Sequence, residues 1–336
     1  MKKILSFVLA LMMVFSATVF AYADDNTWTC SKGHENPADH NFCSVCGEKK
    51  PVASDGDQAW KELYENGDYE TALPLIREAA ESGDAEATAA LASCCIYGYG
   101  MEEDYDQGFR LAQEAADAGN ARGMFLVGRC YDLGDGVEQD YEQAMEWYLK
   151  AAELGDAWAM FNIAALYVEG SGVKRDYEKA MEWFQKAADL GDELAMCYIG
   201  VLYDEGNGVA QDFDKAMEWY RKSVDLGESW GMYGIGDLYL NGCGVEQNYD
   251  KAMEWFLKSA ELGNPAAMYA VGSMYHNGTG VGQDYDRAME WFLKAAELGY
   301  PDAMHAIGVM YENGYGVEQD NTKAQEWYQK AEDAVA

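Results

Sequence analysis

Three cysteines and one histidine near the N-terminus have the residue types and the spacing of a metal site. Cys43 and Cys46 are separated by two residues and precede Gly47. This spacing is typical of a turn whose backbone amides point toward thiolate sulfurs. Cys30 and His34 supply a second pair upstream. Three thiolates and one imidazole satisfy the tetrahedral coordination of zinc. Because so short a segment can bury only a small core, we expect one structural zinc ion to fold it.

Oxidation is the alternative chemistry for these cysteines. A disulfide could join two of Cys30, Cys43 and Cys46 in an oxidising exterior, but one thiol would then be left over. His40 is a reserve ligand, but we favour a solvated loop residue at this position.

Residues 24–51 resemble zinc-ribbon and Ran-binding-protein-type zinc fingers. The residues in comparable places are Trp28, Asn36, Lys50 and Pro51. The resemblance implies a small module held together by its metal. The chain departs from the pattern at His34, which stands one residue later than the usual second cysteine.

The rest of the chain offers little for catalysis. No GxSxG, HExxH or phosphate-loop motif occurs. Beyond the N-terminal segment the histidines are His276 and His305, and neither has a serine or cysteine neighbour in a nucleophile-and-base arrangement. Its aspartates and glutamates recur because they belong to a repeated sequence unit, so pairs of carboxylates are expected without any catalytic role. We therefore expect no enzyme.

A strict 36-residue period organises the chain after this segment. The stretch from Tyr177 to Asp212 recurs before and after itself without any insertion. Its units begin at Tyr69, Tyr105, Tyr141, Tyr177, Phe213, Tyr249, Tyr285 and Asn321. A fixed period of this length is typical of a solenoid, in which each repeat buries its apolar face against its neighbours.

Each unit contains two helical patterns separated by glycine. In the third unit the first pattern places apolar residues three and four positions apart and ends at Gly155; the second runs from Asp156 to Glu169. A glycine holds the position of Gly155 in all seven full units, as a left-handed helix cap requires. The pattern predicts an all-α fold, a right-handed α-solenoid of antiparallel helix pairs.

The repeated string resembles the Sel-one-like repeat, a relative of the tetratricopeptide repeat. The form AxxLGxxYxxGxGVxxDxxxAxxWxxKAAxxG runs from Ala195 through Gly227 with small substitutions, and the resemblance extends from about Tyr69 to the C-terminus. It implies a superhelix for protein interaction without a common catalytic residue. Some secreted bacterial members join the helices of each repeat by disulfides, a cysteine pattern that this chain lacks. We expect its repeat cysteines (Cys94, Cys95, Cys130, Cys197 and Cys243) to be buried thiols, with a Cys95–Cys130 link as the alternative.

The N-terminus has the form of a secretory signal peptide. Lys2 and Lys3 precede an apolar run, and Ala21, Tyr22 and Ala23 form a small-x-small cleavage site. A membrane anchor is the alternative. The expected organisation is a signal peptide (1–23), the zinc module (24–51), a linker (52–58), a capping helix (59–68), seven repeats (69–320) and a capping half repeat (321–336). We expect the protein to be secreted or exposed outside the cell envelope.

The charge balance is strongly acidic. The chain has 59 acidic and 24 basic residues, for a formal net charge of −35. Phosphate groups require a basic surface, so this balance disfavours nucleic acid and anionic membranes as partners.

Comparing the repeats with one another identifies a set of positions that vary. From the third unit onward the first helix hardly changes, whereas the second helix varies at positions 17, 20, 24 and 27 of the unit, counted from zero. These positions form one stripe, here called the variable stripe. We expect it to face solvent and line the concave groove, with some aromatics packed between repeats as the alternative. Its predicted partner-binding residues are Arg122, Phe125, Trp158, Phe161, Leu194, Trp230, Tyr233, Tyr269, His276 and His305.

These patterns favour a secreted, non-catalytic scaffold that binds a protein or peptide along the variable stripe. The first alternative is a cell-wall or glycan-binding protein that stacks sugar rings on the same aromatics. The second is a hydrolase of the β-lactam or cell-wall type.

Overall fold

The computed structural model describes residues 27–29, 35–37 and 56–335. The chain divides into two compact units, Met1–Lys174 and Arg175–Ala336, and each is described by itself. The predicted signal peptide (1–23) and the four predicted zinc ligands (Cys30, His34, Cys43 and Cys46) lie outside the described residues. Strand β1 (Thr27–Thr29) pairs antiparallel with β2 (Glu35–Pro37), with Thr29 opposite Glu35.

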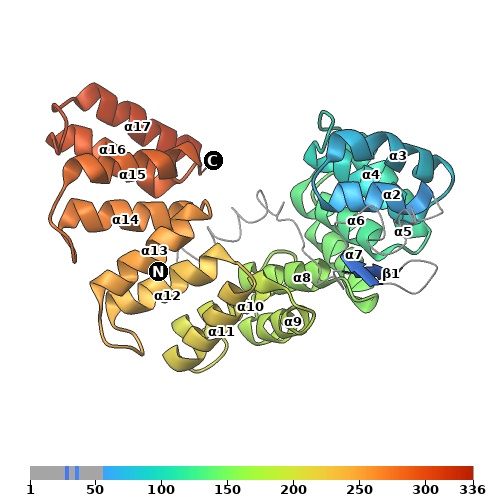
Figure 1. The fold of residues 1–336 in the computed structure, drawn as a ribbon, viewed down its shortest axis with the longest axis horizontal. Coiled ribbons are helices and arrows are strands. Elements are labelled where there is room, and N and C mark those ends of the chain that lie inside the picture. Colours follow the sequence, from blue (N-terminus) through green and yellow to red (C-terminus); the bar gives the residue numbers. More distant parts are fainter. Residues whose placement is uncertain (1–26, 30–34, 38–55, 336) are drawn as a thin grey trace. The chain divides into compact units, whose positions relative to one another are not determined.

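The described helices of the first unit form a stack of antiparallel pairs after one preceding helix (Figure 1). They are α2 (Gly56–Glu65), α3 (Tyr69–Glu81), α4 (Ala85–Tyr97), α5 (Tyr105–Asp117), α6 (Ala121–Leu133), α7 (Tyr141–Glu153) and α8 (Ala157–Glu169).

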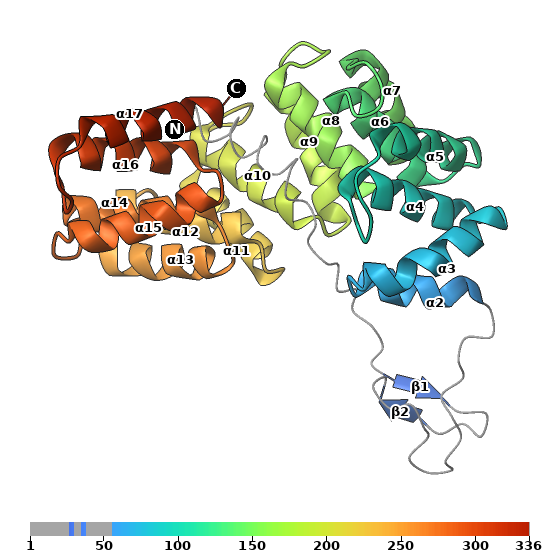
Figure 2. The same ribbon diagram turned by 90° about the horizontal axis from the view of Figure 1, so that it is seen from above.

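The second unit continues the same alternation to its final helix (Figure 2). Its helices are α9 (Tyr177–Asp189), α10 (Glu193–Glu205), α11 (Phe213–Asp225), α12 (Ser229–Asn241), α13 (Tyr249–Glu261), α14 (Pro265–Asn277), α15 (Tyr285–Glu297), α16 (Pro301–Asn313) and α17 (Asn321–Asp333). The predicted helical-repeat solenoid is confirmed.

Local sequence sets both ends of each helix. The Asp140 carboxylate accepts hydrogen bonds from the amides of Glu142 and Gln143, which caps the start of α7. At the end of α7 the amide of Gly155 donates to Ala152 and that of Asp156 to Ala151, the pairing of a Schellman motif. Gly155 has φ of 87°, and the equivalent glycines of the other units are also left-handed, as predicted.

Small residues allow neighbouring repeats to approach closely. Gly128 of α6 faces the ring of Tyr148 on α7, and a β-carbon added to this glycine would lie 2.6 Å from that ring. Tyr148 is fully buried, so the second helix of one repeat packs directly on the first helix of the next. This pair of helices is in closer contact than the two helices within a 36-residue unit.

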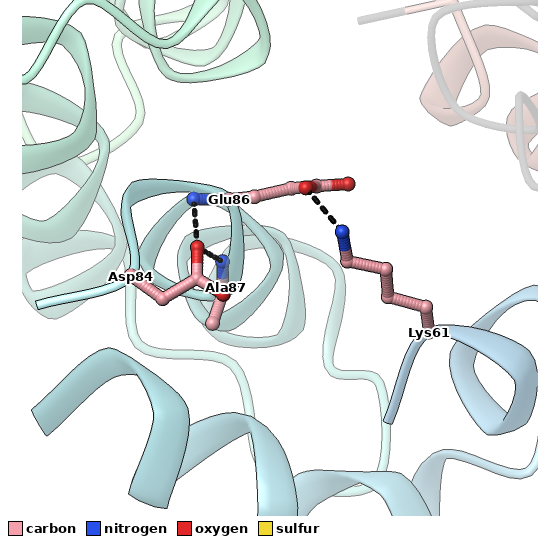
Figure 3. Close-up of polar contacts among 4 residues, drawn as sticks. All are labelled: Lys61, Asp84, Glu86 and Ala87. Atoms are coloured by element: carbon pink, nitrogen blue, oxygen red, sulfur yellow. Dashed lines mark hydrogen bonds and ion pairs between the residues drawn. The ribbon is translucent and has the colours of Figure 1, made fainter. Parts of the chain in front are cut away.

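Helix α2 covers the apolar end of the first pair. Trp60 is buried in a cluster with Ile76 and Leu91, and Lys61 forms an ion pair with Glu86 of α4. Figure 3 shows this ion pair beside the Asp84 carboxylate that caps α4.

The repeat cysteines are free thiols, so the alternative Cys95–Cys130 link is not formed. Cys94, Cys95, Cys130 and Cys197 are buried as predicted, whereas Cys243 is half-buried. None of the helices in the described part of the chain combines the length and the apolar character needed to cross a membrane.

Candidate functional site

The variable stripe is not uniformly exposed, which corrects one expectation. Phe125, Phe161 and Leu194 are buried, with exposed fractions of 3%, 5% and 7%. Arg122, Trp158, Trp230, Tyr233, Tyr269 and His276 are half-buried, and His305 is exposed. The expectation of a solvent-facing stripe is therefore wrong at Phe125, Phe161 and Leu194.

Packing between repeats is the physical reason. The ring of Phe125 lies 5.8 Å from that of Tyr148, the first-helix aromatic of the next repeat. Tyr233 and Phe256 repeat this contact at 5.5 Å. Position 20 of the unit, on the second helix, thus packs at the contact between neighbouring repeats, here called the seam. The buried faces of Phe125 and Phe161 cannot stack on a sugar.

Two predicted residues at position 17 brace these seam rings. The Arg122 guanidinium lies 4.8 Å from the centre of the Phe125 ring. Trp230 meets Tyr233 edge-on at 5.9 Å. Both side chains have packing roles and also keep part of their surface in solvent.

The stripe opens into a pocket at its C-terminal end, between α14, α15 and α16. The pocket has a volume of about 280 Å³. It brings together three of the predicted residues, Tyr269, His276 and His305, which come from two successive second helices. Its other lining residues are Ser273, Asn277, Phe292, Asp302, Ala306 and Val309.

Aromatic contacts hold the walls of the pocket in place. Tyr269 packs on Phe292 at 5.5 Å and on Tyr300 at 5.6 Å between ring centres. The His276 imidazole meets Tyr315 edge-on at 5.5 Å. These contacts fix Tyr269 and His276 before any partner arrives.

His305 is exposed, as are two other residues of the pocket wall, Asn277 and Asp302. The ring of His305 lies 5.0 Å from that of Tyr328 on α17, whose hydroxyl donates to a Glu312 carboxylate oxygen at 3.0 Å. An accessible imidazole therefore stands at the edge of the pocket.

Asp302 gives the pocket its negative charge. It is exposed in the first turn of α16. Burial raises the pKa of Tyr269 and of Tyr300, and the charge of Asp302 contributes to both shifts. In the described part of the chain, the pocket is lined by no lysine or arginine.

A polar contact also joins His276 to its neighbour in the pocket wall. Nδ1 of His276 contacts the side-chain oxygen of Asn277 at 3.1 Å. The residues that the structure describes contain no group of three or more His, Cys, Asp or Glu side chains able to hold a metal ion. What the pocket offers a ligand is aromatic surface, imidazole and one carboxylate.

Sequence comparison between repeats missed Phe292 and did not single out Asp302. Phe292 lies on the nearly constant first helix and therefore looked like an ordinary core residue. Asp302 belongs to the variable stripe, at position 17 of its unit. The sequence did contain a sign of its role, because no other repeat combines an acidic residue at position 17 with a histidine at position 20.

A family model described as the Sel1 repeat matches most of the chain. It matches seven times, at residues 85–120, 121–156, 159–192, 194–228, 231–264, 265–300 and 301–334. Each match begins near a second helix and ends after the next first helix, which is the more closely packed pair.

Solved structures share this architecture. A Sel1 repeat protein from Oxalobacter formigenes is 31% identical with a TM-score of 0.64, and the match covers 72% of this chain and 99% of that one. A protective antigen of uropathogenic Escherichia coli, described as displaying an SLR fold, is 35% identical with a TM-score of 0.58. That match covers 78% of this chain but only 56% of the E. coli protein.

More distant structures show the fold alone. An immunity protein from Pseudomonas aeruginosa is 20% identical with a TM-score of 0.50, covering 64% of this chain and 81% of that one. No curated protein sequence matches the chain. The seven matched repeats and the two closer structures show that the chain belongs to the Sel1 repeat family.

Proposed function

We propose that this Sel1 repeat protein is a secreted, non-catalytic scaffold that binds a protein or peptide segment along the second helices of a right-handed solenoid. The pocket between α14, α15 and α16 is the anchoring point. Its partner-binding residues are Tyr269, His276 and His305, with Asp302 added from the geometry.

The pocket is the observation that carries this proposal. A repeat surface binds tightly where a few preformed pockets accept anchoring side chains, and aromatic residues often supply such anchors. Tyr269 and Phe292 pack against each other, and His276 is braced by Tyr315. A partner therefore meets a site whose side chains are already ordered, which reduces the entropy lost on binding.

A displayed library of random peptides, selected on the immobilised full chain, tests the proposal. We expect a related family of peptides to be enriched. Their affinity should fall roughly tenfold with His305→Ala, as loss of an interfacial aromatic contact commonly does. The matched control is Arg287→Ala, which removes another exposed side chain stacked on a tyrosine, Tyr275, but outside the pocket.

The outcomes separate the alternatives. Enrichment of no peptide family contradicts a peptide scaffold. Equal binding to both variants excludes His305 from the interface. Retention of isolated cell-wall polysaccharide in place of peptide supports the glycan-binding alternative, and turnover of a β-lactam or a wall polymer supports a hydrolase.

We propose further that Cys30, His34, Cys43 and Cys46 hold one structural zinc ion in an N-terminal zinc-ribbon-like module. The support is the ligand spacing, together with the pairing of Thr29 and Glu35, which are the residues next in sequence to Cys30 and His34. A bound zinc ion would stabilise the N-terminal module. The zinc ion would have no part in binding at the pocket, which is formed by the repeats.

A further inference from the structure

Among the second helices of the second unit, α10, α12 and α16 carry acidic side chains, and the basic residues are the histidines of α14 and α16. Helices α10, α12, α14 and α16, all within the described residues, contain no lysine or arginine. Their carboxylates are Glu193, Asp204, Glu205, Asp237, Asp302 and Glu312. Every lysine and arginine from 177 to 333 lies on a first helix, α9, α11, α13, α15 or α17. The lysines and arginines of this part of the chain are therefore confined to the first helices, which carry acidic residues as well.

Tryptophans on the first helices contact several of these lysines. The ammonium groups of Lys222, Lys258 and Lys294 lie over tryptophan rings of their own helices, at 3.6, 4.6 and 4.1 Å from the ring centres. Each tryptophan precedes its lysine by three residues, so the pair forms along one helix. These three ammonium groups are paired with first-helix rings, whereas Arg287 of α15 lies over Tyr275 of α14 at 5.4 Å.

Carboxylates flank the aromatic residues beside the pocket. Tyr269 contacts Tyr300 at 5.6 Å between ring centres. Burial raises the pKa of Tyr233, and the charges of Asp237 on α12 and Asp302 on α16 add to the shift. The faces of aromatic rings and nearby carboxylates both attract a cation.

The pocket is small. Its volume of about 280 Å³ falls just below the roughly 300–1,000 Å³ typical of small-molecule sites. A guanidinium group is flat and weakly hydrated, stacks on aromatic faces and pairs with carboxylates, so it matches this lining better than an ammonium does.

We propose that the pocket receives the guanidinium of an arginine carried by the bound peptide, with Asp302 as its counter-charge and Tyr269 and His305 as its aromatic contacts. This proposal deepens the proposed function and rests on it. It names a basic segment as the partner, and the net charge of −35 would speed the approach of such a segment.

Titration with the short peptide acetyl-Gly-Arg-Gly-amide tests the site directly. The probe is the set of imidazole NMR signals of the full chain, with His276 and His305 assigned through His276→Gln and His305→Gln. We expect both signals to shift saturably. The same peptide with neutral citrulline in place of arginine should bind roughly tenfold more weakly, because it lacks the charge that Asp302 pairs with.

Asp302→Asn should weaken binding of the arginine peptide about fivefold to tenfold by removing that charge. The matched control is Asp286→Asn, which makes the same change at an exposed residue in the first turn of α15. It should leave binding unchanged. Circular dichroism of both variants checks that the fold is retained.

Three results would overturn the inference: no saturable shift, equal binding of the citrulline peptide, or an equal loss in the two variants. Its failure is distinguishable from failure of the proposed function. A peptide family selected without arginine, together with no saturable shift, leaves the scaffold standing and removes the guanidinium site. A saturable, charge-dependent shift without any selected peptide supports a cation site and contradicts a peptide scaffold.

Discussion

The hydroxyl of Tyr148 donates a hydrogen bond of 2.9 Å to Oδ2 of Asp132, and both side chains are buried. Asp132 lies on α6, the second helix of one repeat, and Tyr148 lies on α7, the first helix of the next. Burial raises the pKa of Asp132 to about 6, although the bond from Tyr148 acts in the opposite direction. A polar pair therefore sits within an otherwise apolar seam.

The same pairing recurs between other repeats. Tyr220 donates to Asp204 at 3.2 Å and Tyr328 donates to Glu312 at 3.0 Å. Where the first helix has phenylalanine, the facing position is not acidic: Leu240 packs in the cluster of Phe256. In the seam between α6 and α7 the hydroxyl and the carboxylate occur together, because there either one alone would be a buried polar group without its partner.

Tyr148→Phe should destabilise the protein by roughly 1–3 kcal/mol, because it leaves the buried Asp132 carboxyl without its hydrogen-bond donor. Combining it with Asp132→Leu copies the pair Leu240 and Phe256 and should recover most of the loss. Urea unfolding followed by circular dichroism measures both effects. A double variant no more stable than the single one would contradict this account of the seam.

Stability should fall as pH rises through about 6, and Asp132 should be one cause. Its pKa is about 6 in the folded chain and roughly 3.9 in an unfolded one. The folded chain therefore binds this proton more tightly. The resulting stabilisation is fully present below about pH 4 and is lost as pH passes 6, by at most about 3 kcal/mol. Asp204 has a pKa of about 6 and acts in the same direction.

Urea unfolding at pH 4.5 and pH 7.5 checks this dependence. Asp132→Asn cannot titrate at this position, so it should lose less stability between the two pH values than the unchanged chain does. Asp286→Asn, at an exposed position, should behave like the unchanged chain, since both share the background repulsion of an acidic protein. If the free energies of unfolding of Asp132→Asn and of the unchanged chain differ by the same amount at both pH values, Asp132 is not a cause of the pH dependence.

Trp60→Ala should expose the N-terminal end of the repeats. Trp60 is 3% exposed and packs with Ile76 and Leu91, so truncation is expected to cost about 3–5 kcal/mol locally. Amide hydrogen exchange should accelerate in α2 to α4 and stay unchanged in α13 to α17. Lys61→Ala removes the ion pair with Glu86, a partly exposed contact worth no more than about 1 kcal/mol, and serves as the control.

The sequence predicted well what depends on neighbouring residues. The turn at Gly155 is local, so the repeat length and the helix pairs could be derived without a structure. The exposure of Phe125 could not, because it depends on Tyr148 in another helix. Variation between repeats suggested solvent, yet it also arises where two buried residues change together, as Asp132 and Tyr148 do.

The pocket could not be predicted from the sequence. Tyr269, His276 and His305 were selected as stripe residues, but nothing in their spacing shows that they border one cavity with Phe292. The cavity depends on how α14, α15 and α16 pack, a tertiary property. The usable signal was chemical: the two histidines occur in adjacent repeats, each at a position held by other residue types elsewhere.

The N-terminal segment should hold zinc independently of the repeats. The full chain is expected to contain one zinc ion per molecule by elemental analysis, and Cys43→Ser should abolish it because a tetrahedral site needs all four ligands. Cys243→Ser, at a half-buried thiol in the repeats, is the control and should retain the metal. A chelator should remove the zinc and leave the helical circular dichroism nearly unchanged, since each repeat contacts only its neighbours. A metal-free chain whose mass is two hydrogens lower would instead show a disulfide among Cys30, Cys43 and Cys46 and contradict the zinc site.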